Sequence, residues 1–188
     1  MLSCRVASRI ETLLARLQRN EVRPPDDGQR RAAVAAVVHD DRVLLMKRSA
    51  RDGDPWSGHI SLPGGGYQTA DGDLHATAIR EAREELAIDL AATRWVGTLP
   101  ALAPLMSGPR GIEVTPFVFA AEAPPDPHTS AEAESSFWLP LALAESGALD
   151  GSYRYPHLDR VLPCWNYEHH VIWGLTFRIL NELLIAAR

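Results

Sequence analysis

Apolar residues recur at helical spacing near both ends of the chain and again in its middle. This pattern predicts amphipathic helices over residues 7–19, 74–86 and 169–188, each with apolar side chains three or four positions apart. Continuous or alternating apolar runs indicate strands at 32–39, 42–48, 94–102, 112–122 and 135–141. The Asp40-Asp41 pair between the first two strands is typical of a tight turn, so we expect a hairpin there.

Stretches rich in Pro, Gly and Asp separate these elements. A polar connector covers 22–30, an irregular loop with a short strand near its end covers 49–66, and 149–168 shows no clear period. Strands mixed with helices at both ends predict an α/β fold, a sandwich of helices around a mixed β-sheet. We expect a single domain over residues 30–188, preceded by an N-terminal helix and linker over 1–29.

Bulk composition narrows the class of protein. A chain of 188 residues with 46% hydrophobic and 23% charged residues is typical of one soluble domain with a real core. Its net charge of −5 argues against nucleic acid or an anionic membrane as the main partner. A phosphorylated substrate would therefore need local positive charge, from arginines or from metal ions.

The cysteines and the apolar runs indicate a compartment. Only Cys4 and Cys164 occur, which argues against a disulfide framework and against a Cys-rich zinc site. The longest apolar runs, such as 32–38, are too short to cross a bilayer. We expect a cytoplasmic protein with no membrane partner, and the sequence leaves a homodimer open.

Three glutamates crowd one side of the central helix. Glu81, Glu84 and Glu85 are neighbours at spacings of three and four, and such like charges weaken a helix by about a few tenths of a kcal/mol per pair. They border the apolar face of the helix, where repulsion is poorly screened. A compensating cation is therefore expected, either Arg80 and Arg83 or a metal ion.

A glycine run precedes this helix. The stretch LPGGG, residues 62–66, lets the backbone approach a ligand or a metal closely, and the loop after it adds Asp71 and Asp73. Oxygen ligands gathered in this way suit Mg²⁺ or Mn²⁺. Alone, the acidic helix would be a solvated, salt-bridged face and the glycines an ordinary loop. Their ordered combination favours a metal site.

This combination resembles the Nudix hydrolase signature, a glycine followed at set spacing by an Arg-Glu-X-X-Glu-Glu helix. The 27 residues LPGGGYQTADGDLHATAIREAREELAI supply Gly65, Arg80, Glu81, Ala82, Glu84, Glu85 and Ile88, and the strand layout extends the resemblance from about 30 to 140. Two positions depart from the signature. Ala87 replaces a glycine, and the loop is one residue longer, so Gly72 falls at the first acidic position.

The longer loop is similar to that of the coenzyme A pyrophosphatase branch. That branch has an aspartate six residues after the second glycine, which is Asp71 here, whereas its other loop aspartate falls at Gln68. Its upstream pattern matches Leu44, Leu45, Arg48, Ser49, Gly58, Pro63, Gly64 and Gly65. An arginine of that pattern is out of register, with Arg51 nearby.

The resemblance implies a Mg²⁺- or Mn²⁺-dependent hydrolase that cleaves the diphosphate of coenzyme A or acyl-coenzyme A. Glu81, Glu84, Glu85 and the Gly65 carbonyl would bind the metal. Glu81, Glu84 and Arg80 would be catalytic, with Glu81 or a neighbour as the base and Arg80 holding the glutamates. Arg48, Arg51, Gly64 and Gly65 would contact the substrate, and Asp71 would serve as an anchor.

Other residues have a chemistry that the motif does not use. Glu113 or Glu132 could add an acid, and Lys47 and Arg110 could meet phosphates, although residues of these three types are more often solvated. The aromatic and histidine candidates are Trp56, His59, Trp165, His169 and His170, and packing roles are favoured for all of them.

Three readings stay open beside coenzyme A. The substrate could be another nucleoside diphosphate derivative, such as ADP-ribose, a nucleotide sugar or a dinucleotide, or a nucleoside triphosphate. The chain could also bind a nucleotide without cleaving it. Finally, it could be a plain α/β domain whose acidic helix is neutralised by salt bridges alone.

Overall fold

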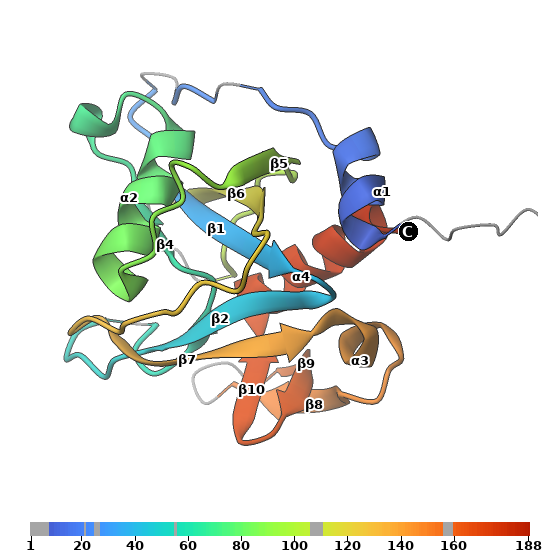
Figure 1. Cartoon of the computed structure of the whole chain (residues 1–188). Helices are drawn as coiled ribbons and strands as arrows, with labels where there is room; N and C mark the ends of the chain where they lie inside the picture. The colour runs from blue at the N-terminus through green and yellow to red at the C-terminus, as the bar shows by residue number, and fades with distance from the viewer. Residues whose placement is uncertain (1–7, 21, 25–26, 55, 106–110, 156–159) are drawn as a thin grey trace, which may run out of the picture.

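The computed structural model describes residues 8–20, 22–24, 27–54, 56–105, 111–155 and 160–188 (Figure 1). The helices are α1 (Arg9–Arg16), α2 (Leu74–Leu86), α3 (Leu141–Glu145) and α4 (Gly174–Ala186), with a short 3-10 turn at Thr69–Asp71. The strands are β1 (Arg31–His39), β2 (Arg42–Arg48), β3 (Ile60–Ser61), β4 (Gly64–Gly66), β5 (Arg94–Thr98), β6 (Glu113–Ala120), β7 (Ala133–Pro140), β8 (Asp150–Arg154), β9 (Val161–Tyr167) and β10 (His170–Trp173).

A mixed sheet lies at the centre of the fold, as the sequence predicts. Its order is β3-β2-β1-β6-β5, with β4 paired to the first half of β1 and β7 paired to β2. Strands β1 and β6 run parallel and the other pairs run antiparallel. Helix α2 covers one side, while α1 and α4 lie together on the other (Figure 1). The α/β sandwich is confirmed.

Strand β1 is apolar along almost its whole length because both of its faces are covered. Ala33 and Ala35 belong to the core under α2, whereas Ala36 and Val38 belong to the core under α1 and α4. This alternation follows from the two-residue period of a strand. In the described residues, no helix combines the length and the apolar character that a membrane crossing needs.

The prediction for the C-terminal part is wrong in two respects. Residues 149–168 are largely ordered as β8 and β9, which form a separate antiparallel sheet with β10. The last helix begins at Gly174 rather than at 169. Gly174 has φ +63°, so the chain changes direction there and residues 170–173 pair as a strand instead of joining the helix.

The glycine run is also more regular than predicted. Instead of ending an irregular loop, Gly64, Gly65 and Gly66 form β4 and pair with Val34, Ala33 and Ala32. Glycine has a low strand propensity, so no local signal indicates this strand. The pairing fixes the glycine backbone beside the second half of α2, where Arg80, Glu81 and Glu85 lie.

Helix α2 begins and ends where the sequence predicts. The Asp73 side chain accepts a hydrogen bond from the Ala76 N–H, which caps the first turn. At the other end Ala87, which replaces the signature glycine, takes the left-handed conformation with φ +55°. The chain therefore keeps the usual helix ending at this position, at a steric cost of about 1 kcal/mol relative to glycine.

Candidate active site

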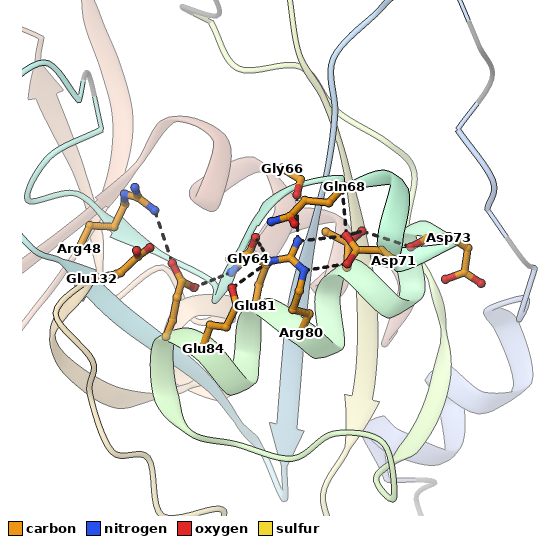
Figure 2. A network of polar contacts seen from close by, with 12 residues as sticks. Arg48, Gly64, Gly66, Gln68, Asp71, Asp73, Arg80, Glu81, Glu84 and Glu132 are labelled. Atoms are coloured by element: carbon orange, nitrogen blue, oxygen red, sulfur yellow. Dashed lines mark hydrogen bonds and ion pairs between the residues drawn. The ribbon is translucent and has the colours of Figure 1, made fainter.

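Helix α2 presents its three glutamates in three different environments (Figure 2). The side chain of Glu85 is 1% exposed, that of Glu81 is 12% exposed, and that of Glu84 is 56% exposed. Two of the acids thus lie in the space between α2 and the sheet, and the third lies at its solvent edge. This gradient follows from the position of the acids at the border of the apolar face of α2.

Arg80 connects two of these glutamates to the preceding loop. Its Nη1 donates to Glu81 at 2.8 Å and to Glu84 at 2.9 Å, and its Nη2 donates to the Gly66 carbonyl at 3.0 Å. Its Nε and Nη2 also donate to the two carboxylate oxygens of Asp71, at 2.7 and 3.0 Å. The surrounding acids raise the pKa of Arg80 further above its normal range. The structure thus places Arg80 where it can hold the glutamates.

Asp71 fixes Arg80 in this position. Besides the guanidinium, its carboxylate accepts hydrogen bonds from the Thr77 hydroxyl at 2.8 Å and the Gln68 N–H at 3.0 Å. The hydrogen bonds from Arg80 are the main cause that lowers the pKa of Asp71, against a smaller opposing effect of burial. Asp71 therefore lies where an anchor of Arg80 is expected. Its recorded hydrogen bonds come from Arg80, Thr77 and Gln68, and not from the glutamates.

The glycine strand is shaped by the glutamates next to it. The Gly64 N–H donates to the Glu85 carboxylate at 2.8 Å. A Cβ at Gly65 would lie 2.5 Å from a carboxylate oxygen of Glu81, and a Cβ at Gly64 would lie 2.3 Å from the Ala33 carbonyl oxygen. A side chain at Gly64 is therefore excluded by the backbone of β1, whereas a side chain at Gly65 would displace the Glu81 carboxylate. The absence of side chains lets Glu81 lie against the β4 backbone.

Carboxyl groups lie close together where β4 meets α2, and burial makes them harder to ionise. Burial raises the pKa of Glu85 to about 8, and the charges of Glu81 and Glu132 act in the same direction, against the Gly64 N–H and Arg48. Burial also raises the pKa of Glu81, together with the charges of Glu84 and Glu132 and against Arg80. The carboxylates would thus be stabilised in their charged form by a further cation.

The donor set fits a hard divalent cation in its chemistry. All the candidate ligands that the sequence predicts, Glu81, Glu84, Glu85 and the Gly65 carbonyl, offer oxygen, which Mg²⁺ and Mn²⁺ prefer. Glu81 and Glu84 accept from the same Arg80 nitrogen, whereas Glu85 accepts from the Gly64 N–H, and the ligand atoms of the three glutamates do not all lie within 4.8 Å of one another. In the described part of the chain, the trio whose ligand atoms lie within 4.8 Å of one another is instead Glu168, His169 and His170, at the β9–β10 turn.

The two arginines that the sequence predicts for substrate contacts are paired with acids. Arg48 donates from Nη2 to Asp54 at 2.8 Å, and its Nη1 lies 3.7 Å from Glu85. Arg51 lies 3.3 Å from Glu132. Sequence reasoning did not find Asp54, because nothing in the local pattern marks it as the partner of a strand arginine six residues away.

The remaining candidates separate into near and distant residues. Glu132 lies close enough to Glu81 and Glu85 for its charge to raise the pKa of both. Glu113 is instead paired with Arg31, with 3.5 Å between the charged atoms. Lys47 pairs with Glu134 at 2.7 Å, and Arg110 is outside the described residues.

Trp165 is buried and contacts Phe177 of α4 edge to face, which agrees with a packing role. His170 stacks on Phe137 with 4.0 Å between ring centroids, and His169 lies beside it at the exposed turn. These three residues contribute nothing to the surroundings of the glutamates.

A cavity of about 310 Å³ adjoins the glycine strand. All three residues of β4 line it, and so do Arg48 and the aromatic candidates Trp56 and His59. Sequence reasoning missed its other main wall, which comes from the small C-terminal sheet. The sequence predicts an irregular stretch over 149–168 and a helix over 169–188, so it carries no signal for this wall.

Comparisons with known proteins agree on one family. The NUDIX domain model matches residues 29–158. A relative from Citrobacter koseri, described as an uncharacterized Nudix hydrolase NudL, is 36% identical over 188 residues, which cover 94% of this chain and 93% of the relative. The NudL of Cronobacter sakazakii is 33% identical over 192 residues, with coverages of 96% and 92%.

Solved structures of low sequence identity share the fold. The crystal structure of a bifunctional NMN adenylyltransferase/ADP ribose pyrophosphatase from Francisella tularensis has a TM-score of 0.58 at 18% identity, over 88% of this chain and 43% of that chain. A C. elegans Ap4A hydrolase binary complex has a TM-score of 0.50 at 20% identity, over 69% of this chain and 90% of that chain.

The chain therefore belongs to the Nudix hydrolase family. It is accordingly an enzyme that hydrolyses pyrophosphate bonds in nucleoside diphosphate derivatives, and members of this family generally use a divalent metal ion.

Replacing Asp71 by Asn tests the anchor of Arg80. We expect the variant to lose about 2 kcal/mol of unfolding free energy at pH 7, because two charge-assisted hydrogen bonds in a nearly buried site are weakened. The folded-state pKa of Asp71 is depressed, so its contribution is complete above the unfolded value near 3.8 and is lost as pH falls through the folded value. Denaturant unfolding at several pH values measures this difference.

The matched control for this experiment is Asp52→Asn, at an exposed aspartate for which the described residues show no contact. This control should leave stability unchanged at every pH. Equal stability of wild type and Asp71→Asn at pH 7, or a difference that persists unchanged down to pH 2, would contradict the anchoring role.

Proposed function

We propose that the enzyme cleaves the diphosphate of coenzyme A or acyl-coenzyme A with Mg²⁺ or Mn²⁺. Water would add to one phosphorus of the bridge as the bond from that phosphorus to the bridging oxygen breaks. The products would be 3′,5′-ADP and 4′-phosphopantetheine or its acyl derivative. The observation that carries the hydrolytic site is the excess of carboxylates between α2 and the glycine strand.

In this proposal, different residues bind the metal, orient its ligands and accept the proton. Glu81, Glu84, Glu85 and the Gly65 carbonyl would hold the metal ion, which when bound neutralises phosphate charge and lowers the pKa of a bound water. Arg80 orients Glu81 and Glu84 through its hydrogen bonds. Glu81, which is largely shielded from solvent, is the candidate base that receives the proton of the attacking water.

Two contacts support coenzyme A as the substrate. Asp71, the loop aspartate shared with the coenzyme A pyrophosphatase branch, is the residue that anchors Arg80. Arg48, which matches the upstream pattern of that branch, reaches from β2 to Glu85 and lines the neighbouring cavity. The positions that resemble this branch thus meet around the glutamates. In this proposal Arg48 and Arg51 turn from their acidic partners toward substrate phosphates, and Gly64 and Gly65 offer backbone groups.

Another nucleoside diphosphate derivative is the main alternative substrate. The solved structures of similar fold include proteins described as an ADP ribose pyrophosphatase and an Ap4A hydrolase. A nucleotide-binding module without catalysis is less consistent with the intact set of Glu81, Glu84 and Glu85.

Removing single carboxylate charges tests the metal site. Glu84→Gln and Glu85→Gln should each lower kcat by about a hundredfold, because an amide is a weaker ligand than a carboxylate and carries no charge. Both variants should also bind Mn²⁺ more weakly in calorimetric titration. The matched control is Glu122→Gln, which neutralises an exposed glutamate in a loop outside this site. Near-normal turnover in both variants would remove these residues from the metal site.

A substrate panel tests the choice of coenzyme A. With Mg²⁺ present, coenzyme A should be hydrolysed with release of 3′,5′-ADP, and with a higher kcat/KM than ADP-ribose, a nucleotide sugar, a dinucleotide or a nucleoside triphosphate. Product analysis by chromatography identifies which bond breaks. Cleavage of ADP-ribose with coenzyme A left intact would show that the substrate is a different member of the class.

A further inference from the structure

The cavity of about 310 Å³ and the acidic cluster lie on opposite sides of the same glycine strand. Ala32 and Val34 of β1 line the cavity, whereas Ala33, between them, packs in the core under α2. The cavity is therefore on the side of the sheet that α4 covers. A molecule whose diphosphate lies at the glutamates could pass the edge of β4 and place its remaining part in this cavity.

Aromatic rings form much of the cavity wall. Trp56 and His59 come from the loop between β2 and β3, Trp173 comes from β10, and Tyr155 directly follows β8. Trp173 contacts His59 edge to face, with 4.9 Å between ring centroids, and it lies tilted against Tyr155 at 5.0 Å. Tyr153 also lies tilted against Trp173, with 4.7 Å between ring centroids, and covers part of its ring. Trp173 nevertheless stays partly exposed and lines the cavity, so the rest of its ring can contact a planar ligand there.

Arg30 supplies a positive charge to the same cavity. Its side chain is exposed, and among the described residues its guanidinium has no hydrogen bond or ion pair. Arg48, the other arginine of the lining, is paired with Asp54 and lies near Glu85. In the described lining, Arg30 is thus the cation that remains available for a ligand phosphate.

We propose that this cavity binds the 3′-phosphoadenosine part of the substrate. The base stacks against the ring of Trp173, and the 3′-phosphate pairs with Arg30. This inference rests on the proposed function, since it takes coenzyme A as the molecule whose diphosphate lies at the glutamates. An acyl chain is the competing occupant of this cavity. An acyl chain has no charge that could pair with the Arg30 guanidinium, whereas the 3′-phosphate has one.

Binding of 3′,5′-ADP and AMP to the full chain tests this subsite without turnover. Tryptophan fluorescence and calorimetry should show that 3′,5′-ADP binds about tenfold more tightly than AMP, because only 3′,5′-ADP carries the 3′-phosphate. Arg30→Ala should remove this tenfold difference and leave the affinity for AMP unchanged. Arg94→Ala, which removes an exposed arginine on β5, should change neither affinity.

Substitution of Trp173 tests the stacking surface. Trp173→Ala should weaken the binding of both nucleotides by about tenfold, the usual loss for one stacked base, and Trp173→Phe should recover most of it. Denaturant unfolding of each variant shows whether the fold is retained. If Trp173→Ala does not fold, the Trp173→Phe variant and Arg30→Ala still decide the question.

Two results would overturn the subsite. The first is equal binding of 3′,5′-ADP and AMP that Arg30→Ala does not alter. The second is a Trp173→Phe or Trp173→Ala defect confined to long-chain acyl-coenzyme A, which would identify an acyl site. If coenzyme A is not hydrolysed but the Arg30-dependent difference is present, the subsite stands and the proposed function fails.

Discussion

The close approach between the glycine strand β4 and helix α2 is the constraint on which the site depends. A side chain at Gly65 would occupy the space of the Glu81 carboxylate, and one at Gly64 would collide with the backbone of β1. Because both positions are bare, the Gly64 N–H reaches Glu85 and the Arg80 guanidinium reaches the Gly66 carbonyl. Backbone groups of β4 and the carboxylates of Glu81 and Glu85 thus lie next to each other.

The arginines around these groups are already paired with carboxylates of the protein. Arg80 is bound by Asp71, Glu81 and Glu84 (Figure 2). Arg48 is shared between Asp54 and Glu85. Even with these partners, Glu85 remains difficult to ionise, because burial outweighs the help that it receives. The arginines therefore organise the acids without fully neutralising them. This balance distinguishes the site from a plain salt-bridged helix, whose acids would be satisfied by the protein alone.

The sequence predicts the features whose signals are local. The period of α2, its acids and the tight turn between β1 and β2 follow from spacing and residue type, and the structure has all three. The strand at Gly64–Gly66 and the sheet β8–β10 could not be predicted in this way. The first is made of residues with low strand propensity, and the second uses short strands in which polar and exposed residues alternate with half-buried ones. Likewise, the pairing of Arg48 with Asp54 and the cavity wall at Trp173 arise from tertiary contacts that no sequence window contains.

The most direct measurement is the anomalous scattering of Mn²⁺ in crystals of the protein soaked with that ion and with coenzyme A. The account predicts a peak between α2 and β4, within bonding distance of Glu81 and Glu85 and next to the substrate diphosphate. It also predicts that Arg80 stays on Asp71 when the metal is bound. A peak confined to Glu168, His169 and His170, or no peak near the three glutamates, would contradict the central claim.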